Sequence, residues 1–193
     1  MEKAVMGDNF SRPTVLKTMV IEPPYPWATD QRARVHSLTQ LKGIRVVSGK
    51  AKCSDHGHFT VSYNVKEKFR EITEFIRNGK EGWNGWAPQP WTIPKPPVCN
   101  RKHCRGYCTV IISEKKRAID WLFLVLGQHV GLCSPAQLRY FCKHNHLPYN
   151  GSRLEGLYKV YLTLCKQLHP QETLFDIDPI FLASPSSSSE SKT

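Results

Sequence analysis

The feature that most constrains the fold is a pair of cysteine-containing segments that lie far apart in the chain. The first, CSDHG, spans residues 53–57, and the second, CNRKHCRGYC, spans residues 99–108. Thiolate sulfur and imidazole nitrogen are preferred ligands of zinc, and a structural zinc site needs four ligands in a tetrahedron. Each segment supplies two such groups at a spacing that one turn can span, so a shared ion would hold the two segments side by side.

The two spacings are Cys-x2-His and Cys-x4-Cys, and they predict the zinc ligands Cys53, His56, Cys99 and Cys104. The second spacing is wide for a zinc knuckle, which leaves alternatives open. His58 is an alternative to His56, and His103 and Cys108 are alternatives to Cys104. The competing interpretation is that these residues are ordinary free cysteines and surface histidines.

The cysteine count and the N-terminal sequence indicate the compartment. The chain has seven cysteines, an odd number, and its first ten residues, MEKAVMGDNF, lack the apolar run of a signal peptide. We therefore expect an intracellular protein, nuclear or cytoplasmic and not secreted, whose thiols stay reduced or bind metal. The longest apolar run, residues 118–126, contains Asp120 and is too short to span a bilayer, so we expect no membrane association.

Strand patterns flank the first cysteine segment. Residues 43–52 are rich in β-branched side chains, and residues 58–64 alternate apolar with polar, which together predict a hairpin with CSDHG at its tip. Residues 64–79 predict a helix with Asn64 as N-cap, Gly79 as the stop signal and an apolar stripe of Val65, Phe69, Ile72 and Ile76. A further strand is expected at residues 108–113, and a short helix at residues 32–41.

The last third of the chain predicts three helices, at residues 114–133, 134–147 and 152–168. The first is apolar around most of its circumference, so we expect it to be the central buried helix. Ser134 and Ser152 are suited to cap the other two. The expected fold class is α+β, with a small zinc-ribbon-like β element, interrupted by an inserted helix, packed on a C-terminal helical half of about three helices.

Composition along the chain suggests where the domain begins and ends. Residues 1–19 resemble a flexible N-terminal arm, residues 20–178 a single zinc-stabilised α+β domain, and residues 179–193 a disordered Ser-rich tail. Between the cysteine segments, residues 80–98 contain five prolines and predict a loop. We expect its tryptophans, Trp83, Trp86 and Trp91, to attach that loop to the core.

The charge balance favours an anionic partner. The chain has 27 Lys and Arg residues against 16 Asp and Glu, a net charge of +11, and nucleic acid is the commonest partner of such a chain. Cations gather around the second cysteine segment and shortly after it, which predicts phosphate contacts at Arg101, Lys102, Arg105, Lys115, Lys116 and Arg117. A protein partner remains the alternative, and the sequence does not set the oligomeric state.

Motifs typical of enzymes are missing from the sequence. It contains no His-Glu-x-x-His, no zinc-deaminase pattern, no P-loop, no Gly-x-Gly-x-x-Gly and no Cys-x-x-Cys. We therefore expect a non-enzymatic module with structural zinc that contacts nucleic acid or a protein. The alternative function is a metal- or cysteine-dependent enzyme of unknown reaction.

Five phrases in the chain resemble a known family. They are IEPPYPWATDQRARVHSL, VKEKFREITEFI, KKRAIDWLFLVLGQHVGLC, QLRYFCKH and LYKVYLTLCKQL, within residues 20–178. They are similar to a land-plant family defined only as a domain of unknown function, whose pattern has two Cys-x2-Cys pairs. Here His56 stands where the first pair has its second cysteine, and Cys99 and Cys104 are more widely spaced. The resemblance implies structural zinc and says nothing of partners.

Overall fold

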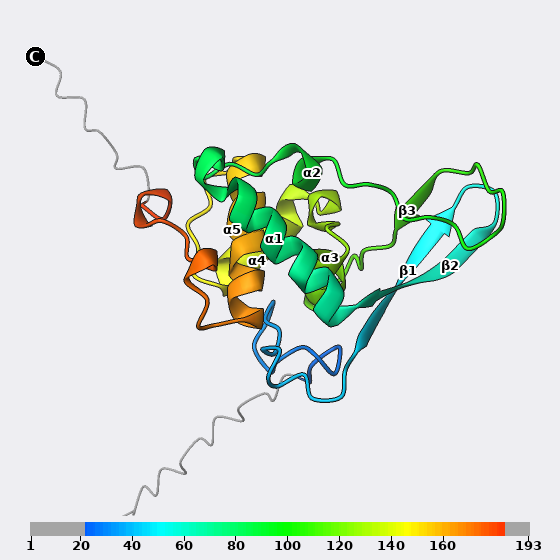
Figure 1. The fold of residues 1–193 in the computed structure, drawn as a ribbon, viewed down its shortest axis with the longest axis horizontal. Helices are drawn as coiled ribbons and strands as arrows, with labels where there is room; N and C mark the ends of the chain where they lie inside the picture. Colours follow the sequence, from blue (N-terminus) through cyan, green and yellow to red (C-terminus); the bar gives the residue numbers. More distant parts are fainter. Residues whose placement is uncertain (1–21, 184–193) are drawn as a thin grey trace, which may run out of the picture.

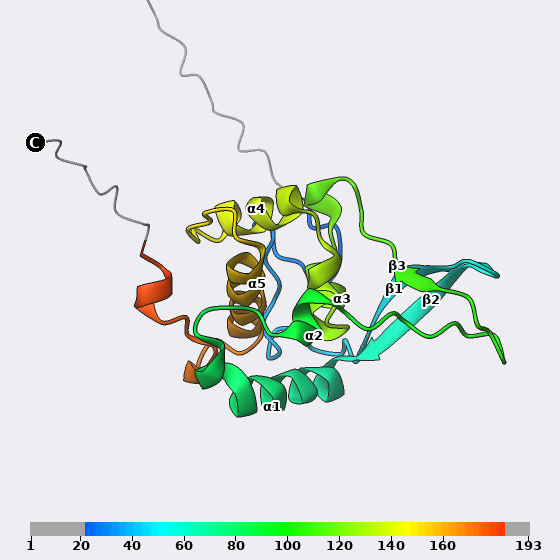
Figure 2. The same ribbon diagram turned by 90° about the horizontal axis from the view of Figure 1, so that it is seen from above.

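Strands and helices occupy separate parts of the molecule. The computed structural model describes residues 22–183, in which a three-stranded sheet extends as an arm from a body of helices (Figures 1 and 2). The strands are β1 (Val46–Cys53), β2 (Gly57–Asn64) and β3 (Cys108–Val110). The α-helices are α1 (Val65–Trp83), α2 (Gln89–Thr92), α3 (Trp121–Leu126), α4 (Pro135–His144) and α5 (Arg153–Leu168). The predicted α+β class is confirmed.

The arm is built on the predicted hairpin. β1 and β2 pair antiparallel from Val46 opposite Asn64 to Cys53 opposite Gly57. β3 pairs antiparallel with the other edge of β1, so the strand order is β2-β1-β3. Because β3 pairs only with residues 51–53, it lies against the end of β1 that carries the first cysteine segment.

Helix α1 begins as predicted but ends later. The Asn64 side chain accepts a hydrogen bond from the amide of Glu67, and the four residues of the predicted apolar stripe are all buried. Gly79 does not end the helix. The absence of a side chain there instead makes room for the ring of Trp83, because a Cβ would lie 2.7 Å from it. The helix ends instead at Asn84, which adopts a left-handed conformation with φ 47°.

The prediction of one long central helix at residues 114–133 is wrong. This segment forms a 3-10 turn, η1 (Lys116–Ala118), the short helix α3, and a second 3-10 turn, η2 (Val130–Leu132). Asp120 caps the start of α3 by accepting a hydrogen bond from the amide of Phe123 at 2.9 Å. After α3, Gln128 has φ 54°, so the helical conformation does not continue. The apolar composition of this segment predicted one continuous helix, but an N-cap within the segment divides it.

The central helix is α5. It begins at the predicted cap, where Ser152 accepts a hydrogen bond from the amide of Glu155, and most of its residues are buried. Its Tyr161 stacks on Trp91 of α2 with ring centroids 4.0 Å apart. Trp91 is fully buried and Trp83 packs against it, whereas Trp86 is 54% exposed. Two of the three tryptophans thus attach residues 80–98 to the core, as predicted. The segment is not all loop, however, because Trp83 ends α1 and Trp91 lies in α2.

Residues 22–41 form an irregular segment, here called the N-terminal strap, that crosses the helical body. The predicted helix at residues 32–41 does not form; the strap contains turns and one bridge between Ala28 and Val35. Its backbone is held by side chains of the body, because Gln167 accepts from the amide of Val35 and Asn145 donates to the carbonyl of Ala33. These tertiary hydrogen bonds take the place of helical ones.

Parts of the predicted domain ends lie outside the described residues. The expected flexible N-terminal segment, residues 1–19, lies entirely outside the described residues. So does most of the expected tail, from residue 184 onward. Of that tail, residues 179–183 are described: Pro179–Phe181 form a 3-10 turn, and the ring of Phe181 lies edge-on to Tyr158.

Candidate metal centre

The structure brings the four predicted ligands together at the outer end of the arm. One ligand atom from each of these residues lies within 4.8 Å of the others, and the group is Cys53, His56, Cys99 and Cys104. The Sγ atom of Cys53 is 3.7 Å from Nδ1 of His56 and 3.4 Å from Sγ of Cys104. Sγ of Cys99 is 3.7 Å from the same imidazole nitrogen. Three sulfurs and one nitrogen therefore converge on one point, as tetrahedral coordination requires.

The hairpin turn positions the first two residues of the cluster. Cys53 is the last residue of β1, is fully buried and lies opposite Gly57 in the ladder. The chain reverses over the intervening residues 54–56, and Gly57 has φ +73°, a conformation that only glycine adopts readily. This tight reversal turns the exposed His56 back toward Cys53.

Two backbone contacts tie the second cysteine segment to the hairpin tip. The amide of Ser54 donates to the carbonyl of Tyr107 at 2.9 Å, and the amide of Tyr107 donates to Ser54 Oγ at 3.1 Å. Directly beyond them, Cys108 pairs with Cys53 in the β1–β3 ladder. The distant segment is thereby positioned by the sheet itself, before any ion is considered.

Gly106 allows the two segments to approach closely. A Cβ at this position would lie 2.7 Å from Cγ of Asp55 and 2.8 Å from Sγ of Cys53. Its amide donates to Sγ of Cys104 at 3.3 Å, a contact of the kind that orients a ligand and stabilises its charged form. The Cys-x-Gly sequence of residues 104–106 thus has both a steric and an electrostatic role.

The pKa values of two thiols in the cluster are shifted in opposite directions. Burial raises the pKa of Cys53, but hydrogen bonds from the amides of Asp55 and His56 and from the imidazole outweigh burial and lower the pKa to about 6. At Cys104, the amide of Gly106 lowers the pKa, but burial and the thiols of Cys53 and Cys99 raise it to about 11. The first thiolate thus opposes formation of a second, and a divalent cation among them would remove that repulsion. The arrangement is compatible with metal binding.

The three alternative ligands lie outside the cluster. Cys108 is buried beside it, but its thiol points toward the carbonyl of Gly106 at 3.6 Å. His58 and His103 are exposed, and neither belongs to the group of converging ligand atoms. The cluster thus favours Cys104 over its two sequence alternatives.

The predicted phosphate contacts lie in two separate places. Arg101, Lys102 and Arg105 are exposed on the loop at the outer end of the arm (Figure 1). Lys115, Lys116 and Arg117 lie at η1, where Arg117 lines a cavity against the N-terminal strap. The two groups therefore do not form one continuous contact set around the cluster.

A cavity of about 570 Å³ lies away from the cluster, between the strap and residues 117–121. The sequence patterns give no sign of it, because its walls come from segments far apart in the chain. The sequence PPYPWATDQRAR is rich in aromatic and arginine residues, which is the one feature that could have indicated the cavity. These residues do not have the spacing of a metal-binding or catalytic motif.

Fold and cluster together define an α+β protein in which a Cys3His cluster, compatible with metal binding, closes the end of a three-stranded arm. The chain belongs to the family described as a domain of unknown function, DUF7086, which matches residues 36–168 and so includes both cysteine segments. No curated protein and no solved structure matches the chain. Between residues 22 and 183, no helix has both the length and the apolar character needed to cross a membrane.

Proposed function

We propose that the chain is a non-enzymatic zinc-binding module whose metal-closed arm contacts the phosphate backbone of nucleic acid. The observation that carries the zinc assignment is the convergence of three cysteine sulfurs and one histidine nitrogen within 4.8 Å. This ligand set is typical of structural zinc, and soft thiolates disfavour magnesium and calcium. Four protein ligands leave no coordination position for a substrate, which favours a structural role over a catalytic one.

Zinc at this position would fix the geometry of the arm. The ion would join the hairpin tip, through Cys53 and His56, to a loop that otherwise depends on the contacts between Ser54 and Tyr107 and on the three-residue strand β3. The loop carrying Arg101, Lys102 and Arg105 would thereby be held rigidly beside the sheet.

The charge of the arm supports a polyanionic partner. Residues 46–64 and 93–113 contain one acidic residue, Asp55, and six cations: Lys50, Lys52, Lys95, Arg101, Lys102 and Arg105. Lys50 and Lys52 point to one face of the sheet, opposite Thr60 and His58 of β2. The sheet face and the loop together present cations with almost no compensating charge, as binding to phosphates requires.

An exposed aromatic ring accompanies these cations. Tyr107 is 71% exposed although its backbone is hydrogen-bonded to the hairpin tip. An exposed ring with a fixed backbone, on a loop that also carries cations, is a combination on which unpaired bases stack. We therefore expect single-stranded nucleic acid to bind more tightly than duplex of the same length.

Metal analysis of purified protein tests the zinc assignment. We expect one zinc per chain in the wild type and less than a tenth of that in Cys53→Ser, Cys99→Ser and Cys104→Ser. Cys108→Ser is the matched control, because it removes a buried thiol beside the cluster and should retain zinc. A folded wild type without zinc, or zinc lost from Cys108→Ser but kept by Cys104→Ser, would contradict the assignment.

Fluorescence anisotropy with a mixed-sequence single strand tests the nucleic-acid assignment. The affinity should fall linearly with salt on a log–log scale, with a slope near −0.7 per phosphate neutralised. The triple variant Arg101→Ala, Lys102→Ala, Arg105→Ala should bind at least ~10-fold more weakly and reduce the slope.

A triple variant on α1 serves as the control for charge. Lys66→Ala, Arg70→Ala and Arg77→Ala remove the same number of exposed cations from the helical body. Equal loss of affinity in the two triple variants would indicate attraction to net charge alone. Affinity that does not depend on salt would exclude the phosphate contact and leave a protein as the partner.

A further inference from the structure

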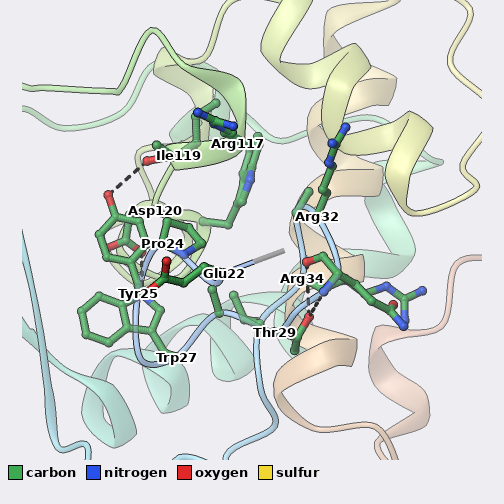
Figure 3. A pocket seen from close by; sticks show the side chains of 16 residues that line it. Glu22, Pro24, Tyr25, Trp27, Thr29, Arg32, Arg34, Arg117, Ile119 and Asp120 are labelled. Atoms are coloured by element: carbon green, nitrogen blue, oxygen red, sulfur yellow. Dashed lines mark hydrogen bonds between the residues drawn. The ribbon is translucent and has the colours of Figure 1, made fainter. Parts of the chain in front are cut away.

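The cavity between the N-terminal strap and η1 has the composition of a ligand site. Its volume of about 570 Å³ lies within the range of small-molecule pockets. Figure 3 shows its two sides, with Tyr25, Trp27 and Asp120 on one and Arg32 and Arg34 on the other, while Arg117 lies above. Apolar surface and several cations thus border the same space.

The aromatic side of the cavity is held in place by its own hydrogen bonds. Tyr25 and Trp27 stack with ring centroids 5.4 Å apart and planes 8° from parallel. The Tyr25 hydroxyl donates to the carbonyl of Ala118 at 3.1 Å, and the Trp27 indole donates to Oδ1 of Asp120 at 2.9 Å. Both rings are therefore fixed before any ligand binds, which lowers the entropic cost of binding.

The arginines of the cavity have no counter-ion among residues 22–183. None of the guanidinium groups of Arg32, Arg34 and Arg117 makes an ion pair or a hydrogen bond with a described residue. The two carboxylates that line the cavity do not compensate for them. Asp120 accepts from Trp27 and Phe123 instead, and Glu22 forms no ion pair with the arginines.

Two of these cations line the same cavity although they come from distant segments. Arg32 lies in the strap and Arg117 in η1, yet both act on the hydroxyl of Tyr140 in α4: burial raises its pKa, and the two positive charges oppose that rise. The Tyr140 hydroxyl is itself buried without a hydrogen-bond partner among the described residues.

We propose that this cavity binds a small organic anion, a phosphate or carboxylate group on an apolar body. Arg32 and Arg117 bind the anionic group through charge-assisted hydrogen bonds. The apolar body packs against the stacked rings of Tyr25 and Trp27 and against Trp121. The site is separate from the Cys/His cluster and does not depend on zinc or nucleic acid.

NMR titration of the full-length, zinc-loaded chain tests this proposal. The probes are phenyl phosphate, benzoate, inorganic phosphate and phenol, and the reporter is the Trp27 indole N–H. Phenyl phosphate or benzoate should shift this resonance saturably and bind at least ~10-fold more tightly than inorganic phosphate or phenol. The proposal is overturned if neither organic anion gives a saturable shift. It is also overturned if phenol binds as well as the two organic anions.

Charge variants locate the binding to this cavity. Arg32→Gln with Arg117→Gln should weaken phenyl phosphate binding at least ~10-fold, because each loses a charge-assisted contact. The control, Arg139→Gln with Arg70→Gln, removes two exposed arginines from α4 and α1 and should bind as the wild type does. Equal weakening in both pairs would show that only net charge matters, which contradicts a site.

The first 21 residues of the chain are the competing occupant. Their two acidic residues are Glu2 and Asp8. In the full-length variant Glu2→Gln with Asp8→Asn, the Trp27 resonance without ligand should match that of the wild type. A shift of this resonance in the variant, together with tighter binding of phenyl phosphate than in the wild type, would mean that this segment occupies the cavity, and the proposal would be wrong.

Discussion

The helical body and the β arm of this protein are stabilised in different ways. The largest fully buried side chains of the described chain all belong to the body, among them Trp91, Tyr158, Tyr161, Phe141 and Phe175. In the arm, the fully buried residues of the hairpin are Val47, Ala51 and Cys53, which are small. Burial of apolar area scales with side-chain size, so the body has a core of its own and the arm has little. An arm of this kind needs a cross-link, which the Cys/His cluster can supply.

Removing zinc should have the largest effect and should be confined to the arm. Apparent binding energies of structural zinc are roughly 10–16 kcal/mol in small peptides, and the arm has little other stabilisation. With a chelator present, hydrogen exchange should become fast at residues 46–64 and 108–110 and remain slow in α5. Cys53→Ser without a chelator should give the same pattern. Simultaneous loss of protection in α5 would mean that arm and body unfold as one unit.

Trp91→Ala tests the body in the complementary way. Trp91 stacks on Tyr161, contacts Trp83 and donates from its indole to Gln128, so truncation leaves a large cavity and an unpaired amide oxygen. We expect a loss of about 3–5 kcal/mol in the free energy of unfolding, measured with urea. Zinc content should remain at one per chain, with Trp86→Ala, at an exposed position, as the mild control. Zinc loss at urea concentrations where the variant is folded would disagree with independent stabilisation.

Asp120 gives the body a pH dependence that the arm does not share. Burial raises the pKa of its carboxyl to about 6, against roughly 3.9 in an unfolded chain. The folded state therefore binds the proton more tightly, and this contribution is complete below pH ~4 and is lost as the pH rises through 6. Its size is on the order of 2–3 kcal/mol.

Asp120→Asn should remove this dependence while keeping an oxygen that can accept from Trp27 and Phe123. The measurement is the free energy of unfolding of wild type minus variant between pH 4.5 and 7.5. Because both proteins carry the same cysteines, protonation of the arm cancels in the difference. A difference that stays constant over this range would rule out the proposed titration.

The smallest expected effects come from two helix caps, one at the junction and one within the body. Asn64 ends β2 and caps α1, and Ser134 caps α4 in a capping box with Gln137. Each change to Ala should cost about 1 kcal/mol, measured with urea on the zinc-loaded protein. A cost at Asn64 several-fold above that at Ser134 would show that the junction couples the arm to the body.

Local chemistry made much of this structure predictable. Asn64, Ser134 and Ser152 cap the helices they were expected to cap, because an N-cap depends on a few neighbouring residues. The spacing of the cysteine and histidine residues also predicts the four members of the Cys/His cluster. Their convergence follows from the hairpin, whose tip was recognisable from its alternating strands and its glycine.

Features that depend on tertiary partners were not predictable. The helix expected at residues 114–133 is divided at Asp120, whose carboxylate caps α3 and also accepts a hydrogen bond from Trp27, 93 residues away. Gly79, which resembles a stop signal, instead makes room for Trp83. The cavity lined by Arg32 and Arg117 has no sequence signature, since its two sides come together only when the strap crosses the body.

The position of α1 within the chain has a consequence for the order of folding. His56 and Cys99, which converge in the cluster, are 43 residues apart, and the whole of α1 lies between them. An ion bound by both segments would close a loop of the chain that contains this helix. The entropic cost of closing a loop rises only slowly with its length. If the loop closes before α1 packs, refolding of the apo chain should accelerate with added zinc; if α1 packs first, zinc should only slow unfolding. Stopped-flow refolding at several zinc concentrations would distinguish the two sequences of events.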